Sequence, residues 1–483
     1  MKKKTFTLAM LLVLLMGCNQ GGSTNSGDDA NTNGDYFVKE NTTIEFLCLT
    51  DSSFKGELEK MINDFKNVEP KVTVNLTNPV AAGNYNVLEK TVISGFFKED
   101  YPDIAQCYPD NVVKYIDMGY AVNIDSYLNN ESYGLKEEKS DYIDVFLKEG
   151  AQYSKEGTYS LPFCKSTELM YYNADILLGL DLSSVDATIN AGQPLTHDYL
   201  NSLTWDDLFN KLCPAIKQYN VTNHIYTDEE DSGIVTIDSD ENFFITLANH
   251  YGYGFASVDA NGKGSIDFDN AGMKSKMLWL REAKDNGYLQ TRGSYKTYVS
   301  GLFTSKKSLF TISSTAGLSY NYDRNNPFKI GVARIPKAEG QEKFSSINQG
   351  PSVCLLDHKD NNRSLAAYLF WKHITNKENA ASWLINTGYS GIRNSCFTSE
   401  AYIAALNPSD KTDLYAQAVA DNLSLTREVA DNMFTTPVFR GSGNARTNVG
   451  LLLKECLTTE DLAGKIDNLF KSYSDDAKSY LGD

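Results

Sequence analysis

Residues able to act in metal or catalytic chemistry are present, but their spacing matches no known catalytic pattern. The histidines are His197, His224, His250, His358 and His373. No two of them have the spacing of metal ligands. The chain has no Gly-x-Ser-x-Gly elbow, no Gly-x-x-x-x-Gly-Lys loop and no Gly-x-Gly-x-x-Gly after its first apolar strand. We therefore expect no metal, no cofactor and no catalytic residue.

One stretch comes close to a calcium-binding loop. Asp259, Asn261 and Gly264 occupy loop positions 1, 3 and 6, but Lys263 stands at position 5, where an oxygen ligand is needed. A hairpin turn at Asn261 and Gly262 explains the pattern better. The chain is rich in acidic residues, so a pair of carboxylates that catalyses glycoside hydrolysis remains an alternative.

The N-terminal segment has the features of a secretion signal. Three lysines precede an apolar run over residues 8–16, which is shorter than the about 20 residues needed to span a bilayer. Leu15-Met16-Gly17-Cys18 resembles the lipobox of bacterial lipoproteins, which implies a signal peptide over 1–17 and a lipid on Cys18. The alternative is an ordinary signal peptide with an accidental cysteine. Residues 19–35 contain no large apolar side chain, so 18–40 should be the lipidated cysteine with a flexible tether.

The composition predicts a folded body that does not bind nucleic acid. The 483-residue chain is long enough for two or three domain-sized cores, and 41% of its residues are hydrophobic. Its net charge of −17 disfavours nucleic acid, which binds through an excess of Lys and Arg. Seven cysteines besides Cys18 have wide spacings and often lie in apolar runs, so we expect most to be free thiols.

Alternating strand and helix patterns predict an α/β fold. An apolar strand over 43–49 precedes helical spacing of Leu58, Met61, Ile62 and Phe65, and a second strand follows over 71–76. A further strand is expected within 95–108. A helix over 202–220 should begin at a capping Thr204, and two consecutive helices should end at Gly388. The unit strand–helix–strand implies parallel strands with helices covering the sheet.

Six stretches resemble the extracellular family-1 solute-binding proteins of bacterial ABC importers, above all their glycerol-3-phosphate and glycerophosphodiester-binding components. They are the first strand–helix–strand unit, "GTYSLPFCKSTELMYYNADIL", "LTWDDLFNKL", "SLFTISSTAGL", "AAYLFWKHITNKENAASWLINTGYSGIR" and "PVFRGSGNARTNV". They occur in family order along nearly the whole mature chain.

This resemblance implies the two-lobed, type II periplasmic-binding-protein fold, with a ligand cleft between lobes joined by hinge crossovers. An N-terminal lobe is expected from 41–164 plus 307–357, and a C-terminal lobe from 165–306 plus 358–483. The chain should first cross at Ser166, return near 306–317 and cross a third time near 352–361.

The resemblance also implies a set of ligand contacts. These are Tyr85, Ser166, Ser314 (or Ser313 if the register slips), Gly350, Tyr389 and Arg446. Hydroxyls, a glycine N–H and a guanidinium suit phosphate oxygens, and tyrosine rings suit the C–H face of a polyol.

One departure from the family pattern leaves the ligand open. The family places a glutamate where this chain has Pro109, and Asp110 follows it. Asp110 could replace that glutamate from a shifted backbone. The ligand is therefore a phosphorylated polyol, a phosphodiester or a neutral oligosaccharide.

The resemblance implies a monomeric, non-enzymatic receptor, lipid-anchored to the cell membrane outside the cytoplasm, which delivers a carbohydrate-like solute to ABC importer permease subunits. Two other classes stay open. A surface lipoprotein hydrolase would act on glycans or phosphodiesters, and an adhesin would keep the fold without the small-molecule site.

Overall fold

The computed structural model describes residues 36–50, 54–78, 85–229 and 231–482. The predicted signal peptide, Cys18 and the tether up to residue 35 lie outside these ranges. The body that begins at Phe37 is one compact unit. Among the described residues, no helix combines the length and the apolar character needed to cross a membrane.

The first sheet carries the predicted strand–helix–strand unit. Its order is β2-β1-β3-β13-β4, from β2 (Val72–Thr77), β1 (Thr42–Leu47), β3 (Ile104–Cys107), β13 (Ser352–Leu355) and β4 (Leu161–Pro162). β1 is parallel to β2 and β3, whereas β13 is antiparallel to β3 and β4. Helix α1 (Lys55–Val68) buries the four apolar residues that its spacing predicted. Sequence periodicity therefore predicted this unit correctly.

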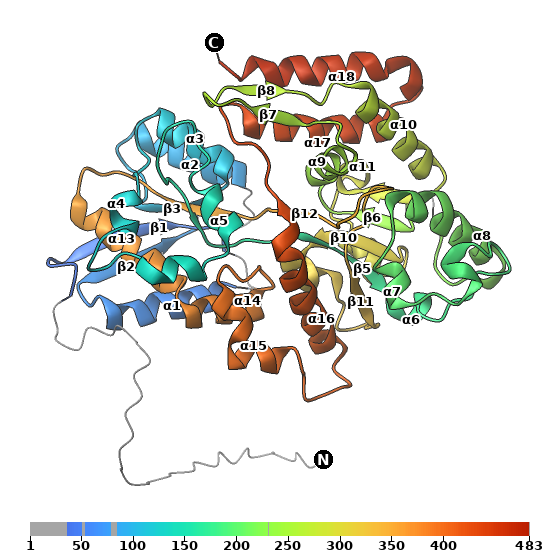
Figure 1. Ribbon diagram of the computed structural model, residues 1–483, viewed down its shortest axis with the longest axis horizontal. Coiled ribbons are helices and arrows are strands. Elements are labelled where there is room, and N and C mark those ends of the chain that lie inside the picture. Colours follow the sequence, from blue (N-terminus) through green and yellow to red (C-terminus); the bar gives the residue numbers. More distant parts are fainter. Residues whose placement is uncertain (1–35, 51–53, 79–84, 230, 483) are drawn as a thin grey trace, which may run out of the picture. The chain divides into compact units, whose positions relative to one another are not determined.

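The second sheet is built from later segments. Its order is β11-β5-β10-β6-β9, from β11 (Ile330–Ala333), β5 (Glu168–Asn173), β10 (Phe310–Ser314), β6 (Val235–Ile237) and β9 (Leu289–Thr291). β5 is antiparallel to both β10 and β11, and β6 is parallel to β10 and β9. Figure 1 shows the two sheets as separate groups, with β1–β3 in blue to cyan and β5, β6, β10 and β11 in green to yellow. We call the parts built on them the first and second lobes.

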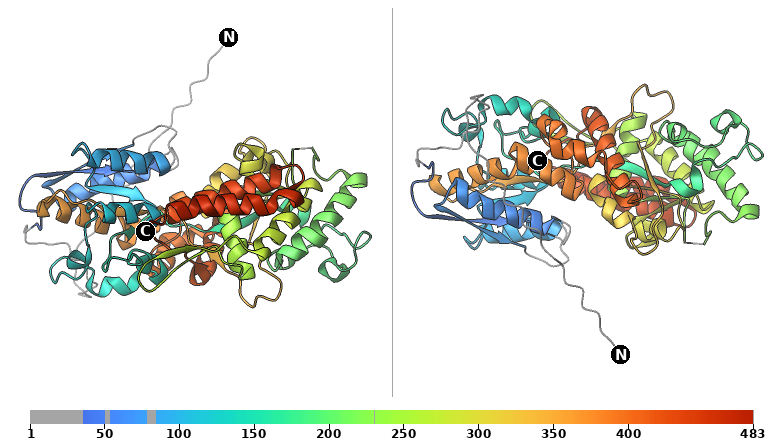
Figure 2. Two further views of the ribbon diagram at one scale, coloured as in Figure 1. Left: turned by 90° about the horizontal axis from the view of Figure 1, so that it is seen from above. Right: turned by 90° about the horizontal axis from the view of Figure 1, so that it is seen from below.

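Helices surround each sheet. The helices of the first lobe are α1, α2 (Tyr85–Phe96), α3 (Pro109–Asp117), α4 (Asp125–Leu128), η1 (Lys136–Asp141), α5 (Asp144–Glu149), α13 (Asn361–Ile374), α14 (Lys377–Thr387), η5 (Asn394–Thr398) and α15 (Glu400–Ala405). Those of the second lobe are α6 (Ala174–Leu177), η2 (Ile189–Gly192), α7 (His197–Leu200), η3 (Asp207–Leu212), α8 (Cys213–Asn223), α9 (Asp240–Tyr251), α10 (Ala271–Asp285), α11 (Arg292–Tyr295), α12 (Ser300–Thr304), η4 (Thr315–Asn321), α16 (Leu414–Val429), η6 (Ala430–Asn432), α17 (Ser442–Thr458) and α18 (Leu462–Ser479). Helices α17 and α18 contact each other and are the paired red helices of Figure 2.

Several local predictions are confirmed. The amide of Asp207 donates to Thr204 Oγ1 over 3.0 Å at the start of the helix that continues through η3 and α8. Gly388 ends α14 with a φ of +75°. Strands β7 (Ala256–Val258) and β8 (Gly264–Ile266) form the expected hairpin around Asn261 and Gly262. The second two-stranded pair joins β12 (Ser346–Ile347) to the parallel strand β14 (Met433–Phe434).

The predicted lobe bounds 41–164 plus 307–357 and 165–306 plus 358–483 are wrong in two places. Strands β10 and β11 belong to the second sheet, so the chain returns to the first sheet between β11 and β13, not near 306–317. Helices α13 and α14 pack in the core of the first lobe, where Phe370 contacts Phe46 of β1. The error has a physical cause: β10 and β11 are short, largely buried strands that would fit either sheet, and only their pairing with β5 assigns them.

The seven cysteines in the described residues are all buried. Burial raises the pKa of several of their thiols, including Cys107, Cys213 and Cys354, above the usual range. A raised thiol pKa disfavours the reactive thiolate. These side chains therefore act as small apolar residues of the core, as the apolar runs around them predicted.

Candidate functional site

The candidate site lies where three helix N-termini and the crossover segments meet. Tyr108 caps α3 from an extended conformation, and Pro109 occupies the first helical position. Proline suits that position because its missing N–H would have no intrahelical partner. Ser239 caps α9 by accepting the amide of Asn242 over 3.2 Å, so Asn242 sits in the first turn of α9. Ser442 begins α17, and Arg446 lies one turn later on the same face of that helix.

Aromatic rings form one side of the site. The rings of Tyr85 and Tyr108 meet edge to face with centroids 4.7 Å apart. Burial, followed by the neighbouring Tyr389 and Tyr108, raises the pKa of Tyr85 well above its usual range. The ring of Tyr389 stacks on Trp383 with centroids 6.0 Å apart. Tyr85 and Tyr389, predicted from distant segments, therefore lie in one aromatic group.

The polar side of the site is centred on Asn242, which is 2% exposed. Its Nδ2 donates to Glu168 Oε1 over 2.8 Å and also to Gln349 Oε1. Its Oδ1 accepts from Nη2 of Arg446. The amide thus joins β5, the crossover before β13 and helix α17.

Two carboxyl groups of the site have raised pKa values. Burial raises the pKa of Glu168 to about 7, against the opposing effects of the Asn242 hydrogen bond and the charge of Arg446. Burial also raises the pKa of Asp110, and the Ser442 hydroxyl and Arg446 offset part of that rise. Both carboxyl groups therefore interact electrostatically with Arg446.

Asp110 lies in this site, but its carboxylate already accepts a hydrogen bond from another residue of the protein. The hydroxyl of Ser442 donates to Asp110 Oδ1, so helix α3 of the first lobe contacts helix α17 of the second. A Cβ built on Gly443 would lie 3.3 Å from the Asp110 Cβ, which shows how closely the two helices approach.

Ser166 and Gly350 lie side by side on two crossover segments. Ser166 exchanges backbone hydrogen bonds with Gln349. Gly350 has a φ of +87°, and a Cβ added there would lie 2.1 Å from the carbonyl oxygen of Cys164. Glycine is required at this position by the close approach of the backbone.

Ser314 reaches the edge of the same site. It pairs with Glu168 in the register of β10 and β5, and its Oγ accepts the amide of Ala316 over 3.3 Å. Ser313, the alternative register, is buried. The seven predicted contacts therefore gather around Glu168, Asn242 and the aromatic group, although the side chains of Ser314, Asp110 and Arg446 each hydrogen-bond to another residue of the protein.

A buried ion pair supports the crossovers beside the site. Lys165, which is 0% exposed, pairs with Glu149 of α5 and donates to the Gly350 carbonyl over 3.0 Å. Asn348 donates to the other oxygen of Glu149 over 2.9 Å. These contacts fix both crossover segments against α5.

Sequence reasoning missed Tyr108, Glu168, Asn242, Gln349 and Ser442. Two of these had a usable signal: Tyr108 precedes the helix-starting Pro109, and Glu168 follows Ser166 by two residues. No sequence pattern marks Asn242 as a site residue. Its role depends on pairing with residues 74, 107 and 204 positions away, which local patterns do not show.

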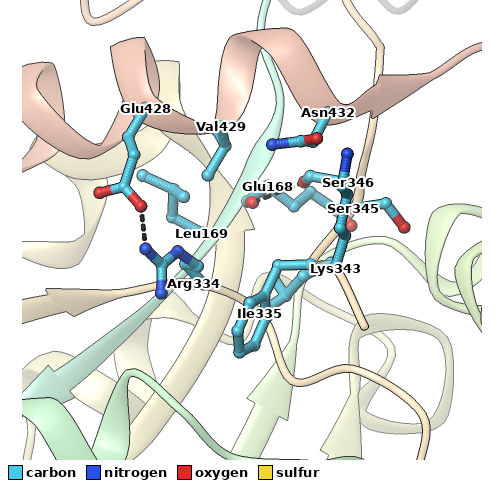
Figure 3. Close-up of a pocket in the computed structure, with 11 residues that line it drawn as sticks. Glu168, Leu169, Arg334, Ile335, Lys343, Ser345, Ser346, Glu428, Val429 and Asn432 are labelled. Carbon is cyan, nitrogen blue, oxygen red and sulfur yellow. Dashed lines mark hydrogen bonds and ion pairs between the residues drawn. The ribbon is translucent and has the colours of Figure 1, made fainter. Parts of the chain in front are cut away.

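A separate cavity of about 300 Å³ lies at the start of β5 (Figure 3). It is lined by Glu168, Leu169, Arg334, Ile335, Lys343, Phe344, Ser345, Ser346, Glu428, Val429 and Asn432. Arg334 and Glu428 form an ion pair at one side of it. It shares only Glu168 with the site described above and contains none of the predicted ligand contacts.

Comparison with known proteins identifies the family. The family model described as bacterial extracellular solute-binding protein matches residues 60–408. The chain belongs to this family.

One curated relative and many solved structures resemble the chain. The Multiple sugar-binding protein of Streptococcus mutans is 25% identical over 378 residues, which is 75% of each chain. UgpB from Mycobacterium tuberculosis, solved with glycerophosphocholine, superposes with a TM-score of 0.68 at 15% identity, over 91% of this chain and 98% of that one. The ABC substrate-binding protein Lmo0181 from Listeria monocytogenes, solved with cycloalternan, gives a TM-score of 0.66 at 14% identity, over 92% and 100%. These likenesses confirm the two-lobed periplasmic-binding-protein fold.

Proposed function

We propose that this protein is the lipid-anchored substrate-binding component of an ABC importer and binds a carbohydrate-like solute at the site around Asn242. The observation that carries the proposal is the meeting of tyrosine rings with Arg446 and buried carboxyl groups from both lobes. Rings offer flat apolar faces to sugar C–H groups, and charged planar groups hydrogen-bond to hydroxyls. No covalent chemistry is required of these residues.

The relatives support a carbohydrate-like ligand. The curated relative is named as a sugar-binding protein, and the solved neighbours include complexes with glycerophosphocholine, acarbose, maltose and cycloalternan. Lipid attachment at Cys18, a permease partner and a monomeric state belong to the same proposal.

Ligand contact is proposed for Tyr85, Ser166, Gly350, Tyr389 and Arg446. Their grouping around the Asn242 network supports this assignment. Asp110 and Ser314 act at the edge of the site, where each holds a helix end.

Thermal unfolding of the detergent-purified full chain tests the function. Maltotriose, cycloalternan, glycerol-3-phosphate and glycerophosphocholine are each added at millimolar concentration. A ligand at 100 times its Kd adds about 2.7 kcal/mol of stability, which gives a clear rise in Tm. A rise with at least one of these solutes is expected. No rise with any of them contradicts the proposed ligand class and favours the adhesin alternative, whereas release of product from a glycan would favour the hydrolase.

A further inference from the structure

We propose that Glu168 selects the ligand: together with Arg446 it binds neighbouring hydroxyls of an uncharged, polyhydroxylated solute, and the carboxyl groups around Arg446 exclude a phosphorylated one. This inference rests on the proposed solute-binding function and narrows its ligand class.

Asn242 positions the two selecting groups. A carboxamide has one acceptor oxygen and one donor nitrogen with two hydrogens. Here the oxygen faces the guanidinium of Arg446, and the nitrogen faces Glu168 and Gln349. The three partners leave only one orientation for the amide. A carboxylate and a guanidinium are therefore held on opposite sides of one rigid amide.

Both selecting groups keep unused hydrogen-bonding capacity. Among the described residues, no hydrogen bond to Glu168 Oε2 is found, and Arg446 makes a hydrogen bond only to Asn242. A guanidinium has five N–H donors. Neither group has an oppositely charged atom within 4 Å in the described part of the chain. Glu168 is only 3% exposed, and buried polar groups normally have partners.

A hydroxyl-bearing solute matches this capacity. Each hydroxyl both donates and accepts, so one hydroxyl can donate to Glu168 while its neighbour accepts from Arg446. The rings of Tyr85 and Tyr108 contact each other, and burial raises the pKa of Tyr108 to about 12 while the nearby charge of Arg446 opposes that rise. A polyol chain or sugar ring can therefore contact the aromatic and polar sides together.

The charges facing Glu168 disfavour an anionic solute. Burial raises the pKa of Glu168 and that of Asp110 on α3, and the charge of Arg446 on α17 offsets part of each rise. The charges of Glu241 on α9 and of Asp238 before it raise the pKa of Glu168 further. Burial also raises the pKa of Asp238. Two further cations offset part of these rises: Lys114 for Asp110 and Arg292 for Asp238. Lys114 already pairs with Glu89, and Arg292 lies over the Tyr298 ring. A phosphate at Arg446 would compete with Glu168 and Asp110 for the one cation whose charge acts on both of these carboxyl groups.

Calorimetric titration of the detergent-purified full chain at pH 8 tests the inference. The probes are maltotriose and cycloalternan as neutral solutes, and glycerol-3-phosphate and glycerophosphocholine as phosphorylated ones. Wild-type protein should bind a neutral solute at least tenfold more tightly than either phosphorylated one. Glu168→Gln keeps the shape and an acceptor for Asn242 but removes the charge, so neutral-solute affinity should fall at least tenfold.

Two further variants test whether direct contact of Glu168 with the solute, rather than the net charge or the fold of the protein, sets the affinity. Glu59→Gln removes an equal charge from the exposed surface of α1, and neutral-solute affinity should change less than threefold. Asn242→Asp should weaken binding of the neutral solute, because it places a second carboxylate against Glu168. The pH profile supplies a readout that a structural role would not move: wild-type affinity for the neutral solute should rise severalfold from pH 6 to pH 8, and that of Glu168→Gln should stay level.

The possible failures are distinguishable. If wild-type protein binds a phosphorylated solute more tightly than any neutral one, the receptor function stands and the inference is overturned. The same holds if Glu168→Gln binds the neutral solute as wild type does. If wild-type protein binds none of the four probes, the proposed function fails and the inference fails with it. The wild-type comparison needs no variant, so it holds even if Glu168→Gln does not fold.

Discussion

Ser442, at the start of α17, donates a hydrogen bond to the carboxylate of Asp110, at the start of α3, and so joins the two lobes across 332 residues of sequence. The carboxylate also lies near the N-terminal end of a 17-residue helix, where negative charge is favoured. Asp110 therefore acts as a contact between lobes. The family resemblance predicted a ligand contact at Asp110, where the structure has this contact between the lobes.

Ser442→Ala should weaken the contact between the lobes. A hydrogen bond to a charged group contributes about 1.5–3 kcal/mol, and its loss leaves Asp110 buried without this donor. Spin labels can be attached through cysteines that replace the exposed Lys60 of α1 and Lys465 of α18. Electron paramagnetic resonance should then show a broader distribution of the distance between the two labels. Thr447→Ala is the control, because this exposed hydroxyl bonds only within α17. Equal distributions for Ser442→Ala and wild type would contradict the role of Asp110.

Glu168 should make the protein less stable as the pH rises. Burial raises its pKa in the folded state to about 7 from its ordinary value of 4.5. The folded protein therefore holds a proton that the unfolded chain has lost, and the free energy of unfolding falls between about pH 4.5 and pH 7. For a group this buried the fall is of the order of 3 kcal/mol.

Urea unfolding at pH 5, 6, 7 and 8 measures this effect. Glu168→Gln should flatten the slope in part, since burial also raises the pKa of Asp240 to about 6. The exposed Glu59→Gln on α1 should leave the slope unchanged. Parallel pH profiles for Glu168→Gln and wild type would show that Glu168 does not take up the proton.

Gly350→Ala should destabilise the crossover between β12 and β13. The new Cβ would lie 2.1 Å from the Cys164 carbonyl oxygen, so the backbone of the neighbouring crossover must move. Gly340→Ala is a matched control, because its φ of +79° is similar and no atom lies within 4 Å of the new Cβ. Gly340→Ala should cost about 1 kcal/mol of unfolding free energy, from backbone strain alone. Gly350→Ala should cost at least twice as much, and equal costs would rule out the steric explanation.

Lys165→Met should lower the free energy of unfolding by about 3–5 kcal/mol, because it leaves Glu149 buried without its cation. Lys148→Met removes an exposed lysine from an i, i+4 pair with Asp144 and should cost less than about 1 kcal/mol. Denaturant unfolding compares the two. The double variant Lys165→Met with Glu149→Leu should recover part of the loss. A cost for Lys165→Met no larger than that for Lys148→Met would show that the buried pair does not hold the crossovers.

Local structure was predictable from sequence, and long-range pairing was not. The spacing of Leu58, Met61, Ile62 and Phe65 predicted α1 because one helix face must be buried. The lobe to which β10 and β11 belong depends on pairing with β5, and short buried strands do not encode a partner. The same limit applies to the site: Arg446 was recognisable in its glycine-rich setting, but Asn242 acquires its role only from partners far along the chain.

Calorimetric titration of wild-type protein and Arg446→Ala with a neutral oligosaccharide at pH 8 tests the central claim most directly. The account predicts saturable binding at one site for wild type and a loss of about 1.5–3 kcal/mol, or ten- to hundredfold in Kd, for Arg446→Ala. Equal binding by the two proteins would place the solute elsewhere and contradict the proposed site.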